Sequence, residues 1–390
     1  GIASEGSFLL DLPGGGTRVR RRCCAKVTAT APHALVSESS TRSTADGIRA
    51  VTPRTRCPDL LRRTARQGLI GVFALTHPAV PAAAQNGPTL AEHVLEALEE
   101  HRIVALGENH GHAELHALLL ETLRDPRVAA RVDDIAVEFG NARYQDVVDR
   151  YVAGASVPED SLAMAWRNTV VSPSTVWESP VYRRFFEEMR EINRSLEPGT
   201  RYRVVLADSD VDWSRVEHRD DLAPFYDRAT AMAETIRRES LLRGRRSLFL
   251  AGGLHVARRA RVRLSRDRIP VAEPTPVVLL ELHHPGVTWV VQSMGRAAEL
   301  GLEALVGRGA PRVVVLDTRP TIAGIEANLT TTLRNRDGSR PDVYGAARLG
   351  DVVDAALLWD PEEVTLLEAP PPAFADDAWW AELDRRGLLV

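Results

Sequence analysis

The segment that most constrains the fold spans residues 103–138, because it has the pattern of a strand, a helix and a second strand. Residues 103–106 form a short apolar run that ends at Gly107, which predicts a buried strand. Leucines recur at helical spacing within residues 113–124 and predict a helix with one apolar face. Residues 135–137 predict a second buried strand. Since such a crossover is right-handed and joins parallel strands, the sequence predicts an α/β fold.

Polar side chains follow both of these strands. Glu108 and His110 come directly after the first strand, and Glu138 comes directly after the second. Parallel strands end at the same edge of their sheet, and open α/β sheets bind ligands at that edge. We therefore expect Glu108, His110 and Glu138 to lie in one site.

The rest of the chain continues the same alternation of strands and helices. We expect a mainly parallel central sheet with helices on both faces, in one large domain over residues 88–390. Further strands are predicted at 202–206, 247–251, 277–282, 287–291 and 312–316, and helices at 141–153, 159–167, 180–196, 222–243 and 378–386. The polar stretch 168–178 is long for a connector, which predicts a loop that closes over a substrate.

Two more strand ends add candidate site residues. Asp208 follows the strand at 202–206, where it either points into the site or caps a turn. Gly252 and Gly253 let the backbone turn tightly after the strand at 247–251, so that His255 emerges at the same edge. Two histidines with carboxylates suit a divalent metal, and the candidate ligands are His110, Glu138, Asp208 and His255. The same side chains also suit general acid and base chemistry without a metal.

The N-terminal region differs in composition from the predicted domain. Residues 1–59 lack any hydrophobic period, which predicts disorder or an upstream extension of the reading frame. Residues 60–84 are basic, then apolar, then rich in small side chains, which favours a signal peptide and an extracytoplasmic location over a buried helix or a linker. All three cysteines lie before residue 60, so the domain itself has no thiolate for a metal or a disulfide.

The charge distribution and the hydropathy argue against a nucleic-acid partner and against a membrane span. The formal net charge is −4, and because residues 1–84 carry +7, the remainder carries −11. A nucleic-acid partner for the domain is therefore disfavoured. No apolar run approaches the roughly 18 residues that a membrane-spanning helix needs, so we expect no integral span.

Three stretches resemble the ChaN-like haem-binding uptake proteins, which belong with the Tiki proteases and the erythromycin esterases: GENH at 107–110, EFGNARYQDVVDRYVAG at 138–154 and LAGGLHV at 250–256. Tiki proteins are marked by two G-x-x-H motifs with a glutamate between them, and His110, Glu138 and His255 occur here in that order. Two differences stand out. Gly111 replaces the acidic residue usual in ChaN proteins, and erythromycin esterases space their glutamate and histidine one residue further apart, so a macrolide substrate is not implied.

The resemblance and the residues together leave three readings of function. The first is an exported hydrolase of ester or peptide bonds, acting on a small molecule or a peptide through Glu108, His110, Glu138 and His255. The second is a haem-binding or iron-binding uptake protein, for which Tyr144 and His110 are the candidate iron ligands. The third is a non-catalytic scaffold that keeps only the fold.

Overall fold

The structure, a computed structural model, describes residues 88–264, 270–294, 311–325, 327, 344, 347–359, 364–366 and 377–389. The predictions of a disordered segment at 1–59 and of a signal peptide at 60–84 lie outside these residues. Within them, no helix is long and apolar enough to cross a membrane.

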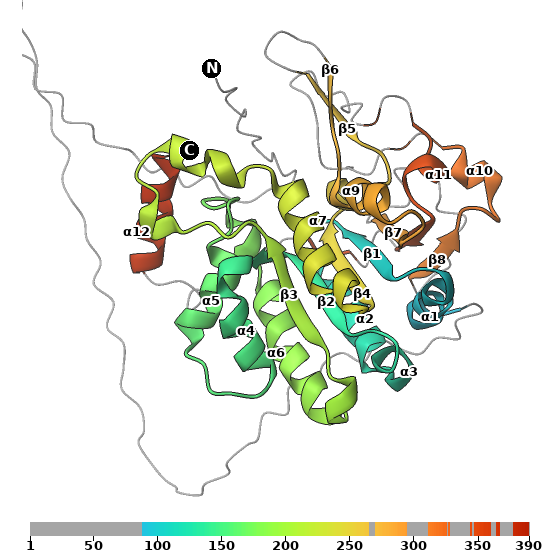
Figure 1. The fold of residues 1–390 in the computed structure, drawn as a ribbon, viewed down its shortest axis with the longest axis horizontal. Helices are drawn as coiled ribbons and strands as arrows, with labels where there is room; N and C mark the ends of the chain where they lie inside the picture. The colour runs from blue at the N-terminus through green and yellow to red at the C-terminus, as the bar shows by residue number, and fades with distance from the viewer. Residues whose placement is uncertain are drawn as a thin grey trace, which may run out of the picture. The chain divides into compact units, whose positions relative to one another are not determined.

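A seven-stranded, mostly parallel sheet forms the centre of the domain, with the strand order β3-β2-β4-β1-β7-β9-β8 (Figure 1). All neighbouring pairs are parallel except β8 with β9 at one end. The strands are β1 (Ile103–Glu108), β2 (Asp134–Asn141), β3 (Arg203–Asp208), β4 (Ser247–Gly252), β7 (Thr288–Met294), β8 (Arg312–Val315) and β9 (Ala355–Leu358). A separate antiparallel pair joins β5 (Arg261–Leu264) and β6 (Pro270–Glu273). The predicted fold class is confirmed.

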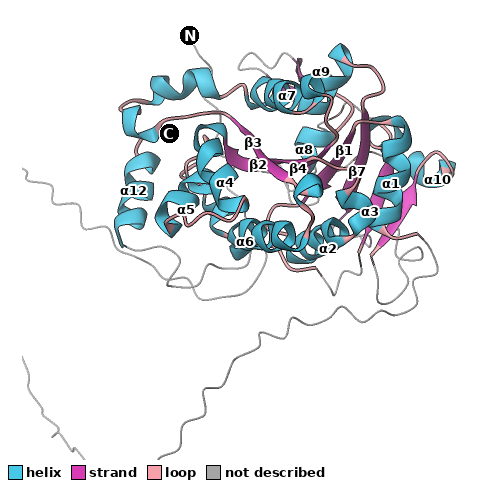
Figure 2. Cartoon of the chain, turned by 60° about the horizontal axis from the view of Figure 1, so that its bottom comes forward, coloured by secondary structure: helices cyan, strands magenta, loops and turns pink. Residues whose placement is uncertain are grey.

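Helices cover both faces of the sheet (Figure 2). The principal ones are α1 (Leu90–Glu100), α2 (Ala113–Arg124), α3 (Pro126–Ala129), α4 (Gln145–Val152), α5 (Glu159–Arg167), α6 (Pro180–Ser195), α7 (Arg228–Glu239), α8 (Gly253–Val256), α9 (Pro276–His283), α10 (Pro320–Ala323), α11 (Leu349–Val352) and α12 (Asp377–Gly387). The side chains of β1 alternate between two cores: Val104 and Leu106 pack with α1 to α6, whereas Ile103 and Ala105 pack with α7 to α11. This alternation explains why every residue of β1 is apolar and buried until Gly107.

One predicted strand is wrong. Residues 277–282 belong to helix α9, which begins at Pro276 after the N-cap Thr275. The Thr275 side chain accepts a hydrogen bond from Val278 N at 3.1 Å. A continuous apolar run has neither a helical nor a strand period, so only the cap and the packing against the sheet distinguish the two structures.

The stretch 168–178, predicted as a loop that closes over a substrate, has little regular structure. It forms turns and a short 3-10 helix (Thr175–Glu178), and Trp177 and Glu178 are buried. Arg386 of α12 donates to Asn168 Oδ1 at 2.7 Å and to Ser172 Oγ at 2.9 Å. The segment is therefore part of the packed domain in this structure.

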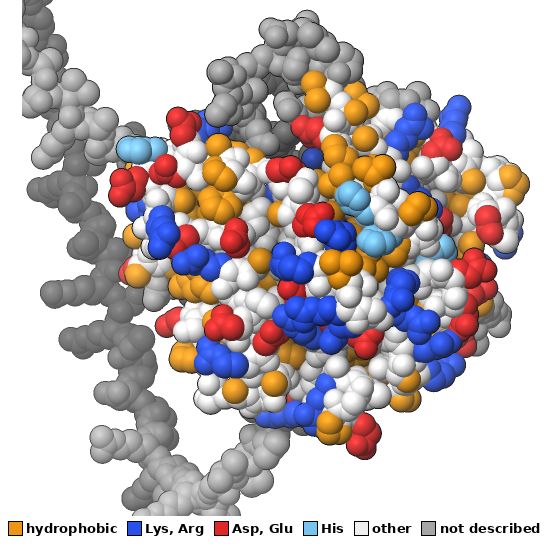
Figure 3. All heavy atoms as spheres, in the orientation of Figure 1, with side chains coloured by type: hydrophobic (Ala, Val, Ile, Leu, Met, Phe, Trp, Pro, Cys, Tyr) orange, Lys and Arg blue, Asp and Glu red, His pale blue; other side chains and the backbone are white. Residues whose placement is uncertain are grey.

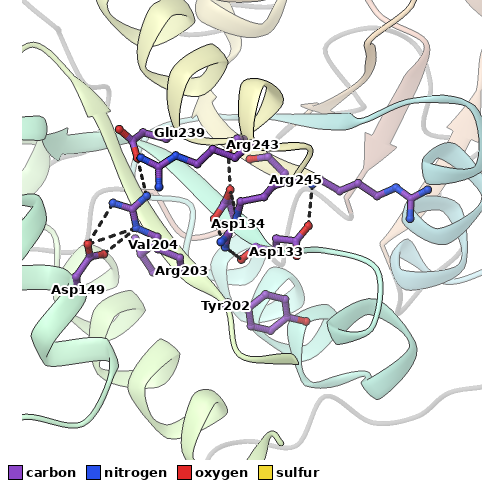
Figure 4. A network of polar contacts seen from close by, with 12 residues as sticks. Asp133, Asp134, Asp149, Tyr202, Arg203, Val204, Glu239, Arg243 and Arg245 are labelled. Carbon is purple, nitrogen blue, oxygen red and sulfur yellow. Dashed lines mark hydrogen bonds and ion pairs between the residues drawn. The ribbon is translucent and has the colours of Figure 1, made fainter. Parts of the chain in front are cut away.

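Ion pairs stabilise the amino-terminal ends of the central strands (Figure 4). Arg203, at the start of β3, pairs with Asp149 of α4 at 3.1 Å and with Glu239 of α7 at 2.7 Å. Arg245 pairs with Asp134, at the start of β2, at 2.6 Å. These contacts fix the strand starts, and the opposite, carboxyl-terminal edge carries the candidate site.

Candidate functional site

The carboxyl-terminal edge of the sheet brings together the side chains that follow β1, β2 and β4. Strand β4 lies between β1 and β2, and Gly252 is in register with Glu108. Glu138 lies within β2, and His255 lies in α8 directly after β4. The parallel arrangement therefore places these residues at one edge, as the sequence predicted.

Glu108 is a buried carboxylate that accepts three hydrogen bonds. His110 Nδ1 and the Tyr182 hydroxyl donate to Oε1 at 2.9 and 3.1 Å, and His116 Nε2 donates to Oε2 at 2.8 Å. Burial opposes ionisation, but the hydrogen bonds from the two histidines outweigh it and lower the pKa of Glu108 to about 2. The carboxylate is therefore ionised at neutral pH, and it requires the proton on Nδ1 of His110.

Glu138 is the centre of a second group. Arg228 donates to Oε1 at 2.8 Å, His255 Nε2 lies 3.2 Å from the same oxygen, and Gly252 N donates to Oε2 at 2.6 Å. Burial raises the pKa of Glu138, but His255, which is protonated in the acidic range where a carboxylate titrates, together with Arg228 and His110 holds it well below its usual range. This carboxylate is also ionised at neutral pH.

The two groups meet at Gly252. A Cβ at this position would lie 2.8 Å from His110 Nε2 and 3.2 Å from Glu138 Oε2, so only glycine lets the imidazole and the carboxylate approach here. The side chain of His110 is 34% exposed and that of His255 is 13% exposed, whereas both carboxylates are buried. The carboxylates thus lie beneath two accessible imidazoles.

The two histidines have pKa values shifted in opposite directions. Burial lowers the pKa of His110, but Glu138 and Glu108 together raise it above its ordinary value of 6.5. For His255, burial outweighs the attraction of Glu138, and the nearby Arg228 contributes to a lowered pKa. Pairs of titratable groups with diverging pKa values are typical of acid and base catalysis.

The four residues predicted as metal ligands do not form a metal site. The guanidinium of Arg228 lies between two of them: it donates to Asp208 Oδ1 and Oδ2 at 2.9 and 3.0 Å, and to Glu138 at 2.8 Å. Its positive charge takes the place that a cation would occupy between these carboxylates. In the described part of the chain, no group of three or more His, Cys, Asp or Glu side chains is arranged to hold a metal ion.

Tyr144, the predicted iron ligand, lies in a different environment. Its hydroxyl accepts a hydrogen bond from Asn168 Nδ2 at 2.6 Å. It lines a cavity of about 900 Å³ with residues of α5, α12 and the segment after β3, among them Trp213 and Arg386. His110 is not in the lining, so the two predicted iron ligands are not brought together.

Sequence reasoning missed four residues that support the site. His116 and Tyr182 carry the pattern of core positions, on the apolar faces of α2 and α6, and nothing in the sequence marks them as partners of Glu108. Arg228 is the first residue of α7, and nothing in the surrounding sequence marks it as a partner of Glu138 and Asp208. Trp177 packs its ring edge to face with His110, with the ring centres 4.8 Å apart, and donates from Nε1 to Thr169 Oγ1 at 3.0 Å.

Comparison with a protein-family model confirms the resemblance. Residues 94–196 match the family described as "Haem-binding uptake, Tiki superfamily, ChaN". The match contains Glu108, His110 and Glu138 and covers about a quarter of the chain. No curated protein matches the chain.

Several solved structures share parts of the fold at low identity. An erythromycin esterase mutant in its open conformation is 12% identical, with a TM-score of 0.46 over 68% of this chain and 92% of that one. A succinoglycan biosynthesis protein is 10% identical, with a TM-score of 0.45 over 70% and 91%. A Bacillus cereus protein is 11% identical, with a TM-score of 0.44 over 68% and 90%. These values are too low to transfer any property to this chain.

Proposed function

We propose that this chain, which resembles the superfamily of the ChaN and Tiki proteins, is an exported hydrolase of ester or peptide bonds. His110 is the general base in this proposal, and Glu108 orients it. The observation that carries the proposal is the hydrogen bond from His110 Nδ1 to the ionised Glu108, which leaves Nε2 with a lone pair on a partly exposed ring.

The contacts of Glu108 hold this imidazole in position. Tyr182 donates to the same oxygen as His110, and His116 donates to the other oxygen, so these contacts hold the Glu108 carboxylate in one orientation and keep the proton of His110 on Nδ1. Trp177 packs against the ring from another side. A base that is fixed before substrate binds loses little entropy in the reaction.

The catalytic step follows from the charges around His110. Nε2 takes a proton from a water molecule, whose oxygen attacks the carbonyl carbon of the substrate. Glu108 and Glu138 stabilise the imidazolium that forms, which is the cause of the raised pKa of His110. When the tetrahedral intermediate collapses, the imidazolium returns the proton to the departing alcohol or amine.

His255 has a separate role in this proposal. Its Nε2 lies against Glu138, so Nε2 carries the proton and Nδ1 is available as an acceptor. The lowered pKa keeps the ring neutral at pH 7. A neutral acceptor beside His110 orients the attacking water or a substrate N–H.

Haem binding is the alternative, and the description of the matched family favours it. The residues fit this group poorly. His110 is not among the residues that line the cavity of Tyr144, and the Tyr144 hydroxyl already accepts a hydrogen bond from Asn168 Nδ2 at 2.6 Å. A scaffold without activity remains the third reading.

One experiment separates the three. Wild type, His110→Ala and the control His283→Ala, which removes an exposed histidine at the end of α9, are screened against ester and peptide substrates and titrated with haem. Hydrolysis that is lost only in His110→Ala supports the proposal. A Soret band that changes only in His110→Ala, without hydrolysis, supports haem binding, and no response in either assay supports the scaffold.

A further inference from the structure

A second cavity, of about 520 Å³, lies at the amino-terminal edge of the sheet, opposite to the edge with Glu108 and Glu138. His101 precedes β1, Trp289 is the second residue of β7 and Asp354 precedes β9, and all three line it. Helix α1 forms one wall, so we name it the α1 cavity. Ala97, in the middle of this wall, is small and leaves the space open.

Negative charge dominates the lining of the α1 cavity. Its ionisable lining residues other than histidine are all acidic: Glu96, Glu99, Glu100, Asp317 and Asp354. Figure 3 shows acidic side chains gathered at the right edge of this face, where α1 lies in Figure 1. Glu99 pairs with Arg131, and Asp354 pairs with Arg258 at 2.5 Å. Glu100 and Asp317 pair with no basic side chain among the described residues.

His93 provides a second, independent observation. The residue is only 7% exposed and lines the α1 cavity from α1. Its nearest polar partner in the described structure is Glu96 Oε2, 3.8 Å from Nδ1, which is too far for a hydrogen bond. Burial lowers its pKa, so the ring is neutral and has one nitrogen that accepts. Neither ring nitrogen has a hydrogen-bond partner among the described residues, so the imidazole can accept a donor from a ligand in the cavity.

We propose that the α1 cavity binds an aliphatic polyammonium ligand, with the chemistry of spermidine. The acidic groups come from α1, from the end of β8 and from the start of β9, and within the described residues no three of them are close enough to chelate one metal ion. Charges spread over a cavity match ammonium groups spaced along a chain. The N–H groups of the ligand donate to His93, and the indole of Trp289 offers a face for cation–π contact. The volume lies within the range of small-molecule sites.

Calorimetric titration of the full chain with spermidine tests the proposal. The double variant Glu100→Gln with Asp317→Asn removes two exposed charges of the lining without touching the core. We expect it to bind spermidine at least tenfold more weakly, whereas Glu197→Gln, an exposed carboxylate outside the cavity, binds as the wild type does. Absence of spermidine binding to the wild type, or equal binding by the double variant, overturns the proposal.

Two further measurements distinguish a site from general charge attraction. His93→Leu keeps the net charge at neutral pH and removes the buried acceptor, and we expect several-fold weaker binding with an unchanged melting temperature. The displacement of bound spermidine by Mg²⁺ is compared with its displacement by putrescine at equal ionic strength. If both displace it equally, the cavity attracts cations without selecting ammonium groups, and the proposal fails. His110→Ala should bind spermidine normally, so this proposal and the proposed hydrolysis fail separately.

Discussion

Replacing Glu108 with glutamine tests whether the buried carboxylate both stabilises the fold and orients His110. Glutamine has nearly the same shape, but it offers one oxygen and an NH₂ group where three donors converge. At least one of the donors from His110, His116 and Tyr182 then faces another donor. The variant therefore loses a charge and leaves a buried polar group unsatisfied.

The pKa of Glu108 gives the size of the expected effect. Its decrease from 4.5 to about 2 corresponds to roughly 3 kcal/mol of stabilisation at neutral pH. Because the folded pKa lies below the unfolded one, this contribution is complete above pH 4.5 and is lost as the pH falls towards 2. We expect Glu108→Gln to lower the free energy of unfolding by about 3 kcal/mol at pH 7, and by progressively less below pH 4.5.

Urea unfolding of the wild type and the variant at pH 7, 5, 4 and 3 measures this difference. Glu121→Gln is the matched control, because Glu121 is an exposed carboxylate on α2, and it should change stability by less than about 0.5 kcal/mol. Equal stability of Glu108→Gln and the wild type at pH 7 would refute the reasoning. A difference that stays constant down to pH 3 would show that packing, not ionisation, is responsible.

Three other predictions concern the site, and a fourth concerns the N-terminus. Arg228→Ala leaves Glu138 and Asp208 without their shared guanidinium and should cost about 3–5 kcal/mol in urea unfolding; its melting temperature should rise on addition of Mg²⁺, and that of the wild type should not. Gly252→Ala places a Cβ 2.6 Å from His110 Cε1, so kcat should fall with little change in KM, whereas Gly199→Ala, with open space around it, should have wild-type kinetics. If His110 is the base, hydrolysis should increase as the pH rises through a midpoint above 6.5, since the pKa of His110 is raised; a midpoint below 6.5 would contradict this assignment. N-terminal sequencing of the native protein should find a start near residue 85, and an intact N-terminus in a cytoplasmic fraction would remove the export proposal.

The sequence by itself determined the class of fold and the edge that carries the candidate site. Hydrophobic period is a local property, so the helices at 113–124 and 159–167 begin and end in the structure at the predicted residues. A strand, a helix and a strand in succession also fix the parallel direction. The positions of Glu108, Glu138 and His255 follow from these two facts, because Glu108 is the last residue of β1, His255 comes just after β4, and Glu138 lies in the carboxyl-terminal half of β2.

Only the tertiary structure decided how these residues interact. Strand β4 enters the sheet between β1 and β2, so Gly252 separates the two carboxylates and lets His110 approach Glu138. The pattern of neighbouring residues does not encode this strand order. The helix at 276–283 was missed for a related reason, since its uniformly apolar side chains have no period and packing decides its form.

The partners of the carboxylates are a second product of the tertiary structure. Tyr182 and Arg228 approach from helices that lie 74 and 90 residues away in sequence from the carboxylates they bind. In the sequence, Tyr182 is one more aromatic of a core-facing helix and Arg228 one of 48 arginines. Because hydrogen bonds and ion pairs need contact within about 3 Å, their presence depends on how the helices pack on the sheet. Packing therefore decided that Arg228, and not a metal ion, lies between Glu138 and Asp208.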